Sequence, residues 1–216
     1  MNTTPLIFDP ETTALLVIDM QRDFCDAGGY AAQAGLDVGN LSSVIDRIAI
    51  LLQAARSSGM RVVHTREGHL PDLSDCPPKK LLRSRQAGAE IGSRGPLGRL
   101  LVRGEYGHDI IDALKPLEHE DVIDKPGYGA FHRTSLESIL AQRIETLIIC
   151  GVTTEVCVHS TLREAIDRGF ACVTVRDGCA ASNPALQEAA LAMIAVEGGI
   201  FGRVASTAEI VRGIRT

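Results

Sequence analysis

The stretch Thr146-Leu-Ile-Ile-Cys-Gly-Val-Thr-Thr-Glu-Val-Cys157 combines three signals that predict the fold. It begins as an uninterrupted apolar run, continues through a glycine-containing turn, and leads into a helical pattern from Glu155 to Arg168 that Gly169 closes. An apolar run without alternation is typical of a strand buried on both faces, as in a parallel sheet covered by helices. The stretch therefore predicts a strand–turn–helix unit of an α/β protein.

The same alternation continues on both sides of this unit. Apolar runs rich in Val, Ile or Leu predict five more buried strands, at Ala14–Ile18, Arg61–His64, Val122–Ile123, Ala171–Val175 and Gly199–Val204. Helical spacing predicts helices at Leu41–Ser58, Ser135–Gln142, Pro184–Glu197 and Ser206–Arg212. This pattern indicates a doubly wound, six-stranded parallel sheet flanked by helices, formed by residues 1–216 as a single domain.

One segment departs from the alternation. Residues 66–107 are dense in Gly, Pro and charged residues and show weak periodicity. A loop of this length inside a compact domain is usually functional. We therefore interpret residues 66–107 as a lid or as a segment that contacts another subunit.

Composition argues against several classes of function. Aromatic residues make up 4% of the chain and Trp is absent, which disfavours a surface that stacks nucleic-acid bases. The formal net charge is -5, and no block of Lys or Arg forms a phosphate-binding stripe. No apolar run reaches the roughly 18 to 20 residues that span a bilayer, and Met1 to Pro10 does not resemble a signal peptide. We expect a cytoplasmic protein whose partners include neither nucleic acid nor membrane.

The cysteines favour a thiol protein over a disulfide-bonded one. All six are found in a chain of ordinary domain length without a secretion signal, where free thiols are the rule. No CxxC pair and no HExxH motif is present. Asp23, His64 and His69 come nearest to a metal-binding set, but their spacing matches no strong metal-site motif. We therefore expect neither a metal nor another cofactor.

Three polar residues lie where predicted strands end. Asp19 ends the first strand, Lys125 follows the third and Cys157 follows the fourth. Ligands of open α/β sheets bind outside the carboxyl ends of the strands, at the switch point of the strand order. With the order 3-2-1-4-5-6, strands one and four are neighbours there, so Asp19 and Cys157 face one crevice. His64, at the end of the predicted second strand, offers an alternative Cys–His arrangement.

Each of the three residues has a functional and a structural interpretation. Cys157, in the first turn of a helix, is either a nucleophile whose thiolate is favoured by free amides and the helix dipole, or a core cysteine like Cys150 and Cys172. Asp19 either accepts the thiol proton, with a pKa raised by burial, or caps the next turn. Lys125 either stabilises the thiolate and keeps Asp19 ionised, or is an ordinary surface lysine.

Three motifs of the chain resemble the isochorismatase-like cysteine hydrolases in order and spacing. They are Val17-Ile-Asp-Met-Gln-Arg-Asp-Phe24, Asp124-Lys-Pro126 and Gly151-Val-Thr-Thr-Glu-Val-Cys-Val158, and the resemblance extends roughly from Thr12 to Val211. It implies a catalytic triad of Asp19, Lys125 and Cys157, and amide or carbamoyl hydrolysis through a thioester-type acyl-enzyme. It also implies homo-oligomers, commonly tetramers, and a cis peptide bond between Val152 and Thr153 that directs the amides of Thr153 and Cys157 at an oxyanion.

Within that family the chain is most similar to biuret hydrolases. The similarity lies in Phe24-Cys-Asp-Ala-Gly-Gly-Tyr30, His64-Thr-Arg-Glu-Gly-His-Leu-Pro-Asp-Leu73, Leu100-Leu-Val-Arg-Gly-Glu105, Asp124-Lys-Pro-Gly127, Thr161-Leu-Arg-Glu-Ala165 and Gly198-Gly-Ile-Phe-Gly202. The chain departs from it at Tyr128, where those enzymes have Lys, and at Glu197, where they have Gln.

The resemblance implies a substrate pocket with Phe24 as an apolar wall, Tyr128 near the entrance and Glu197 as an acceptor of N–H groups. The two departures remove one positive charge and add one negative charge. A carboxylate such as Glu197 accepts hydrogen bonds only. The changes at Tyr128 and Glu197 therefore favour a neutral ureido substrate, with triuret ahead of biuret. The alternative is that Glu197 merely ends a surface helix.

Two other functions are compatible with the sequence. One is another hydrolase of the same family, with ureidoacrylate, N-carbamoylsarcosine, maleamate or nicotinamide as substrate; Arg66, Arg103 or Lys79 would then bind a substrate carboxylate. The other is a non-catalytic redox sensor with Cys157 as the sensor thiol. The presence of Asp19 and Lys125 beside Cys157 in one set of motifs argues against the sensor.

Overall fold

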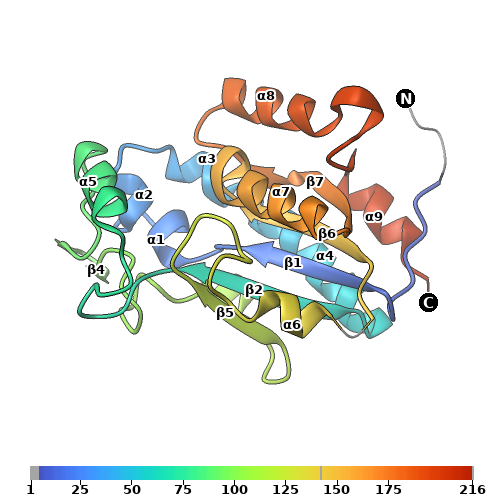
Figure 1. Ribbon diagram of the computed structural model, residues 1–216, viewed down its shortest axis with the longest axis horizontal. Helices are drawn as coiled ribbons and strands as arrows, with labels where there is room; N and C mark the ends of the chain where they lie inside the picture. Colours follow the sequence, from blue (N-terminus) through green and yellow to red (C-terminus); the bar gives the residue numbers. More distant parts are fainter. Residues whose placement is uncertain (1–4, 142, 216) are drawn as a thin grey trace.

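The computed structural model describes residues 5–141 and 143–215, and its centre is a six-stranded sheet (Figure 1). All strand pairs in this sheet are parallel, in the order β5-β2-β1-β6-β7-β8. Counted along the chain, this is the expected order 3-2-1-4-5-6, with β1 and β6 adjacent at the switch point. The strands are β1 (Thr13–Ile18), β2 (Arg61–Glu67), β5 (Asp121–Lys125), β6 (Thr146–Val152), β7 (Ala171–Ala180) and β8 (Arg203–Ala205).

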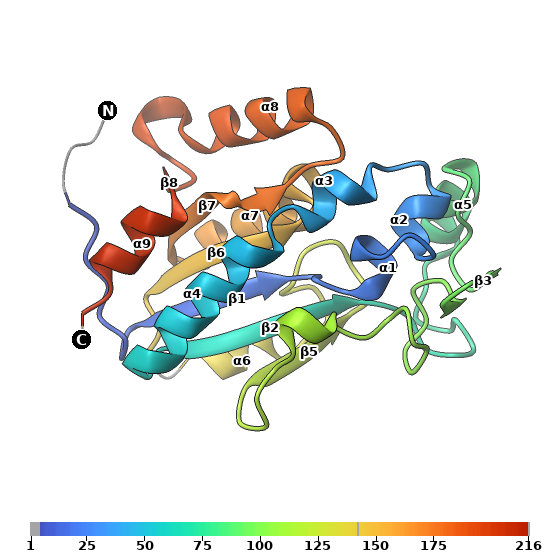
Figure 2. The same cartoon turned by 180° about the vertical axis from the view of Figure 1, so that it is seen from behind.

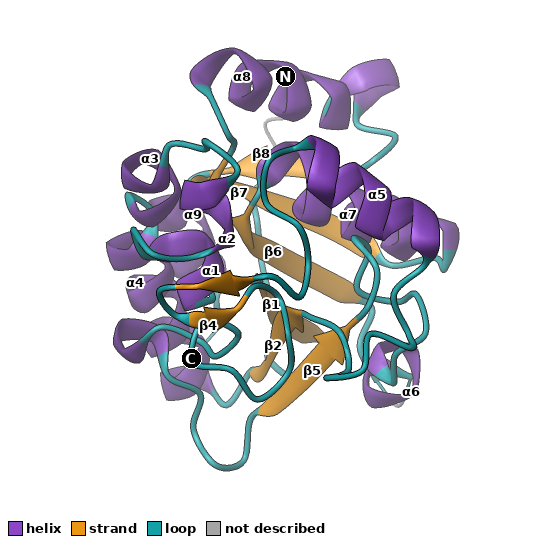
Figure 3. Cartoon of the chain, turned by 90° about the vertical axis from the view of Figure 1, so that its left-hand side faces the viewer, coloured by secondary structure: helices purple, strands orange, loops and turns teal. Residues whose placement is uncertain are grey.

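Helices cover both faces of the sheet, which explains the uninterrupted apolar strands. Every residue of β1 is buried, and so is every residue of β6 after the first. On one face lie α3 (Val38–Ser42), α4 (Ile45–Ser58) and α9 (Thr207–Gly213); on the other lie α6 (Leu136–Leu140) and α7 (His159–Asp167) (Figures 2 and 3). Helix α8 (Pro184–Ile194) lies at the edge of the molecule.

The helix boundaries follow capping chemistry that the sequence signals. Gly59 ends α4 in the left-handed conformation, with φ 74°. Asn183 caps α8 by accepting a hydrogen bond from the amide of Leu186. Ser206 and Glu209 form a reciprocal capping box at the start of α9.

Several predicted boundaries are wrong by a few residues. The predicted helix over Leu41–Ser58 is divided between α3 and α4, and α8 ends at Ile194 before a short 3-10 turn, η3 (Val196–Gly198). The last strand begins at Arg203, after a turn in which Gly199 and Gly202 have positive φ. Of the helix predicted over Ser135–Gln142, Gln142 lies outside the described residues.

The stretch Val38–Ser58 qualifies by length and mean hydropathy, 1.2, as a possible membrane-spanning helix, so the expectation that no stretch would do so is corrected. Three of its apolar side chains, Ile48, Leu51 and Leu52, are buried in the core, whereas Ile50 is exposed. Asp46 and Arg56 belong to the same helix. This burial is that of a core helix in a globular domain.

The segment 66–107 has structure of its own beyond the carboxyl ends of the strands (Figure 1). It contains helix α5 (Pro78–Gln86) and the short hairpin β3–β4 (Arg94–Gly95 and Gly98–Arg99). Buried Leu100 and Leu101 anchor it, and the amide of Leu101 donates to the carboxylate of Asp23 in the short helix α1 (Arg22–Cys25). The segment therefore packs on the domain next to the predicted site.

Candidate active site

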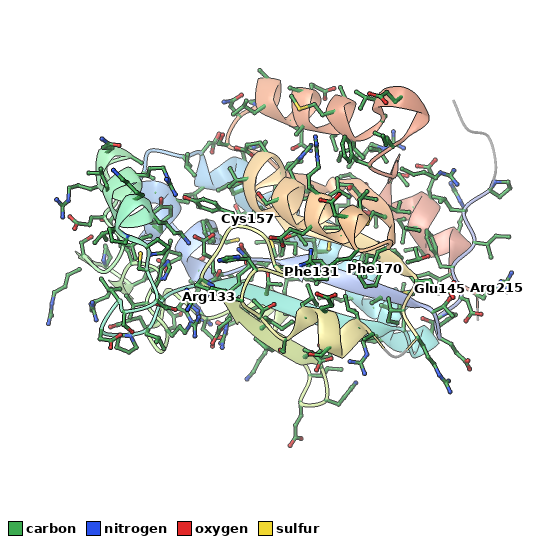
Figure 4. All side chains as sticks on the ribbon, in the orientation of Figure 1. Phe131, Arg133, Glu145, Cys157, Phe170 and Arg215 are labelled. Carbon is green, nitrogen blue, oxygen red and sulfur yellow. The ribbon has the colours of Figure 1, made fainter. Side chains whose placement is uncertain are left out.

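Four neighbouring strands, β5, β2, β1 and β6, lead directly into four chemically active side chains. Lys125 and Glu67 are the last residues of β5 and β2, and Asp19 follows β1 directly. Cys157 lies in a π-helical turn, η2 (Thr154–Val158), between β6 and α7 (Figure 4). All four are buried. The sheet thus brings together Asp19, Lys125 and Cys157, as predicted, and adds Glu67.

An ion pair joins Asp19 to Lys125. Oδ2 of Asp19 lies 2.8 Å from Nζ of Lys125, and both side chains are fully buried. The backbone of Asp19 has φ 50°, which turns the chain sharply where β1 ends. The ammonium group of Lys125 also donates to the carbonyls of Gly127 and Tyr128, at 3.0 Å each. The loop after Lys125 is therefore fixed by the lysine itself, and the surface-lysine interpretation is wrong.

The thiol of Cys157 points toward the carboxylates. Sγ lies 3.3 Å from Oε2 of Glu67, and ligand atoms of Asp19, Glu67 and Cys157 all lie within 4.8 Å of one another. The peptide bond between Val152 and Thr153, which leads into this turn, is cis. The alternative that Cys157 is an ordinary core cysteine does not account for this polar environment.

The electrostatics of the thiol differ from the sequence-based expectation. Burial raises the pKa of Cys157 well above its ordinary value of 9.0; Lys125 opposes this rise, whereas the charges of Glu67 and Asp19 add to it. Burial also raises the pKa of Asp19, against the effect of Lys125. The resting state is therefore a neutral thiol, and the expected thiolate is corrected, because depth and two carboxylates outweigh one ammonium group.

Sequence reasoning missed Glu67. One of its oxygens, Oε1, lies 2.6 Å from Nζ of Lys80 on α5, and the other faces Cys157 and Lys125. The side chain of Gln21 binds both the amide and the carbonyl of Glu67 and so fixes its backbone next to β1. Burial would raise the pKa of Glu67, but the charges of Lys80 and Lys125 outweigh burial and lower that pKa to about 2.

Aromatic residues border this cluster. The rings of Phe24 and Tyr30 meet edge to face, 5.9 Å apart, and Phe24 is buried. Burial raises the pKa of Tyr30, and smaller contributions come from Glu67, Tyr128 and Cys157, so the phenol lies within electrostatic reach of the cluster. The ring of Tyr128 lies 4.8 Å from Nζ of Lys80.

The structure places Glu197 elsewhere. It is an exposed residue in η3, between the end of α8 and the start of β8. In a parallel sheet all strands begin at one end and finish at the other. Glu197 precedes the start of β8, whereas Cys157 follows the end of β6, so within one chain the two residues lie at opposite ends of the strands. Its predicted place in the pocket beside Cys157 is corrected to the alternative, a residue that ends a surface helix.

A cavity of about 320 Å³ opens beside the cluster. Lys80, Tyr128, Arg83 and Arg133 are among its lining residues. A larger cavity of about 520 Å³ involves Arg61 and Asp121, which begin β2 and β5, and so lies at the opposite edge of the sheet. The cavity of about 320 Å³ adjoins the chemistry through Lys80, which pairs with Glu67, and Tyr128, whose carbonyl accepts from Lys125.

The other candidate binding residues are mostly committed to structural contacts. Arg66 pairs with Asp124 and Asp109, and Arg103 with Asp75, whereas Lys79 is exposed on α5.

The possible metal-binding set is dispersed. Asp23 accepts from the amides of Tyr30 and Leu101, while His64 lies 3.3 Å from Glu120 and His69 lies 3.2 Å from Asp75. His64 is therefore turned to Glu120, away from its suggested role as a base.

Asp19, Glu67 and Cys157 also have the spacing of metal ligands. The ammonium group of Lys125 already lies 2.8 Å from Asp19 and 3.4 Å from Glu67. The positive charge that these two carboxylates attract is therefore the ammonium group of Lys125.

Comparisons with known proteins agree with this geometry. The family model described as the isochorismatase domain matches residues 13–209. A ureidoacrylate amidohydrolase RutB of Methylorubrum extorquens is 38% identical over 209 residues, covering 94% of this chain and 83% of that protein. RutB of Caulobacter segnis is 33% identical over 215 residues, covering 95% and 87%.

Solved structures share the fold. A cysteine hydrolase from Pseudomonas syringae pv. phaseolicola superposes with a TM-score of 0.80 at 30% identity, covering 98% of this chain and 97% of that one. The N-carbamoylsarcosine amidase of Thermoplasma acidophilum superposes with a TM-score of 0.69 over 91% of this chain and 96% of its own. At 24% identity, the second match speaks for the fold alone.

Proposed function

Because the chain belongs to the isochorismatase family of hydrolases, we propose that it cleaves a C–N bond of a small ureido compound through a covalent acyl-enzyme on Cys157 and releases ammonia. The observation that carries this proposal is the buried cluster at the switch point of the sheet. There, a thiol, a carboxylate of raised pKa and an ammonium group lie within a few ångströms of one another. These are the groups that nucleophilic acyl transfer requires.

The directions of the pKa shifts support Asp19 as the proton acceptor. Oε2 of Glu67 lies 3.3 Å from the thiol, but the lowered pKa of Glu67 makes it a very weak base. Burial gives Asp19 a raised pKa and hence a higher affinity for the proton. Lys125, 2.8 Å away, stabilises the ionised Asp19 between turnovers.

The proposed cycle moves one proton back and forth. Asp19 takes the proton of Cys157 while Sγ attacks the carbonyl carbon, and the amides of Thr153 and Cys157 stabilise the oxyanion. Asp19 then gives the proton to the leaving nitrogen as the C–N bond breaks, which forms the thioester. A water molecule, deprotonated by Asp19, attacks the thioester, and the thiol recovers its proton from Asp19 as the second product leaves.

The substrate class follows from the walls of the site and from the relatives. Phe24, as an apolar wall, and Tyr128, in place of a lysine, support an uncharged ureido compound such as biuret or triuret. Glu197 lies at the other end of the sheet and therefore gives triuret no advantage over biuret. The feature shared by all ureido candidates is a terminal H2N–CO–NH group.

Ureidoacrylate is the second candidate, on two specific observations. It is the substrate named for relatives that are 38% identical to this chain. The cavity beside Tyr128 is lined by Arg83 and Arg133, which would meet a carboxylate at the far end of such a substrate.

We also propose that the chain acts as a cytoplasmic homo-oligomer, in keeping with a tetramer. The outer side of α8 and the turn after it expose Leu186, Met193, Val196 and Ile200, an apolar surface that a second copy would cover. The segment 66–107 either contacts a partner in this assembly or acts as a lid. All six cysteines are free thiols, which suits a reducing compartment.

An ammonia-release assay tests the proposal. Biuret, triuret, ureidoacrylate and maleamate are each incubated with the protein and with Cys157→Ser. We expect ammonia from at least one ureido compound with the native chain and almost none with Cys157→Ser. Reversible oxidation of Cys157, without ammonia from any of the four compounds, would instead support the redox sensor.

A further inference from the structure

The two oxygens of Glu67 have different surroundings. Oε1 lies 2.6 Å from the ammonium group of Lys80, whereas Oε2 faces the thiol of Cys157 at 3.3 Å and Lys125 at 3.4 Å. Asp19 differs in this respect, because Thr65 donates to its Oδ1 at 2.7 Å and Lys125 lies 2.8 Å from its Oδ2. Oε2 of Glu67 is therefore the carboxylate oxygen of the cluster with the longest contacts, and it is the one that faces the nucleophile.

Catalysis removes a donor from this oxygen. In the resting state, the S–H group of Cys157 points to Oε2 of Glu67. Once Asp19 has taken that proton, or once Sγ carries an acyl group, Oε2 is a buried anionic oxygen whose remaining polar contact within residues 5–141 and 143–215 is Lys125 at 3.4 Å. A buried carboxylate oxygen without a good donor is costly, so another donor is needed at this position during the reaction.

We propose that Glu67 is a substrate-binding residue whose Oε2 accepts N–H hydrogen bonds from the group being cleaved. This inference rests on the proposed function, because the carbonyl carbon of the substrate must reach Sγ of Cys157. The nitrogen atoms bonded to that carbon then lie next to Oε2, 3.3 Å from Sγ. Their N–H groups replace the donor that the thiol has lost.

Lys80 keeps Glu67 suited to this task. It is buried, it pairs with Oε1, and it donates to the carbonyl of Pro126 at 2.7 Å. Its charge helps to hold the pKa of Glu67 at about 2 against the opposing effect of burial, so Glu67 stays an acceptor only. With Lys80 and Lys125 facing Glu67 and Asp19, the charges of the cluster balance while the thiol is neutral.

The chemistry of Glu67 implies a selection at the reacting end of the substrate. Carbamoyl and ureido groups carry N–H donors on the scissile carbonyl carbon and fit Oε2. An ester offers no such donor on its leaving group, and a carboxylate at this position is repelled. The selection is independent of the far end of the substrate, so it applies equally to biuret, triuret and ureidoacrylate.

Two small alkylating agents test this inference without turnover. Iodoacetamide and iodoacetate have the same leaving group and nearly the same size, but one carries an NH2 group where the other carries a carboxylate oxygen. The rate of modification of Cys157 by each agent is measured by mass spectrometry, which separates it from the other thiols. The ratio of the two rates cancels changes in the thiolate fraction.

The variants separate hydrogen bonding from charge. Glu67→Gln and Asp19→Asn each remove one negative charge next to the thiol, but only Glu67→Gln alters the oxygen assigned to N–H groups. Both variants are compared with the native chain by the ratio of the iodoacetamide rate to the iodoacetate rate. Glu67→Gln should lower this ratio by a factor about tenfold larger than Asp19→Asn does, which is the scale of one charge-assisted hydrogen bond. The double variant Glu67→Gln/Lys80→Met keeps the buried charges balanced and should give the same result if the single variant folds poorly.

Equal ratios in Glu67→Gln and Asp19→Asn would overturn the inference, because Glu67 would then act through its charge alone. An unchanged ratio in Glu67→Gln would also overturn it. The alkylation measurement is independent of the ammonia assay. Loss of ammonia release from every ureido compound would refute the proposed function while leaving the site at Glu67 standing.

Discussion

The hydroxyl group of Thr65 donates a 2.7 Å hydrogen bond to Oδ1 of Asp19, so strand β2 orients the carboxylate that follows strand β1. The amide of Asp19 is in turn bound by the carbonyl and the hydroxyl oxygen of Thr65, at 3.2 Å each. Burial raises the pKa of Asp19, and the hydrogen bond from Thr65 is one of the contacts that limit the rise. Thr65 thus helps to set the pH at which Asp19 can act as a base.

Replacement of Thr65 should shift the acid limb of the pH–rate profile. Thr65→Val removes a bond to the ionised form of Asp19, so the pKa of Asp19 rises and kcat/KM falls off at higher pH. One hydrogen bond of about 1 kcal/mol corresponds to a shift of roughly 0.7 pH unit. The measurement is kcat/KM against pH for ammonia release.

Thr174→Val is the matched control for this prediction. Thr174 is also a buried strand threonine, and its hydroxyl has no hydrogen-bond partner among residues 5–141 and 143–215. The same removal of a hydroxyl there should leave the acid limb in place. A shift of equal size in both variants would mean that Thr65 does not act through Asp19.

Cys157→Ser should retain the fold and lose turnover by at least about a thousandfold, the scale of losing a catalytic nucleophile. Cys150→Ala should instead affect the fold more than the chemistry. Cys150 is fully buried in β6, and the one hydrogen bond of its Sγ within the described residues goes to the carbonyl of Leu16, at 3.7 Å. The substitution should lower stability and leave kcat nearly unchanged. Turnover by Cys157→Ser close to that of the native chain would remove Cys157 as the nucleophile.

The strands and their order could be predicted because buried parallel strands are apolar throughout. The same rule does not detect Glu67, because a search for apolar runs ends β2 before its last residues. Strand β2 was predicted to end at His64, since Thr65, Arg66 and Glu67 are polar and resemble a loop. Glu67 ends its strand as Lys125 does, so it shares the position at the carboxyl end of the sheet that marks Lys125 and Asp19.

Other features depend on contacts that the sequence does not encode locally. Lys80 lies on a helix that no apolar periodicity marks, and it reaches Glu67 only through the packing of segment 66–107. The depth that raises the pKa of Cys157 is likewise a tertiary property. The misplacement of Glu197 was avoidable, since a residue that ends a helix before a parallel strand lies at the amino end of the sheet.

Loss of Lys80 should destabilise the domain. Lys80→Met removes the 2.6 Å partner of the ionised, buried Glu67 and leaves it the longer contacts to Cys157 and Lys125. Breaking a buried pair in this way costs about 3–5 kcal/mol of unfolding free energy. Lys79→Met, one residue earlier on α5, removes an exposed lysine and should have little effect. Urea denaturation of the two variants tests this, and equal stability would mean that the pair does not stabilise the native state.

Charge on the outer side of α8 should weaken self-association. Met193→Glu places a carboxylate in the exposed apolar surface that includes Leu186 and Val196, so the proposed oligomer should dissociate. Ile50→Glu, at a similarly exposed apolar residue on α4, is the control. Sedimentation velocity should show a smaller species for Met193→Glu alone. An oligomer that survives this change would place the interface elsewhere.

His64 should make the domain less stable in acid. It lies buried in β2, 3.3 Å from Glu120. Burial lowers its pKa from the ordinary 6.5 to about 4, with Glu120 opposing and Arg56 adding to the shift. Between these two pH values the unfolded chain binds a proton that the folded chain does not. The unfolding free energy therefore decreases as the pH falls from 6.5 to 4 and is not recovered below, by about 3 kcal/mol for such a shift.

His64→Gln removes this titration while keeping a polar side chain. The difference in unfolding free energy between the native chain and His64→Gln should therefore change by about 3 kcal/mol between pH 6.5 and pH 4, in the sense that the native chain loses more stability. Taking a difference also cancels the contribution of His108, whose pKa burial lowers to about 4 as well. His119→Gln, at an exposed histidine, should reproduce the native curve. Parallel curves for the native chain and His64→Gln would show that His64 stays neutral in both the folded and the unfolded chain, or gains its proton in both.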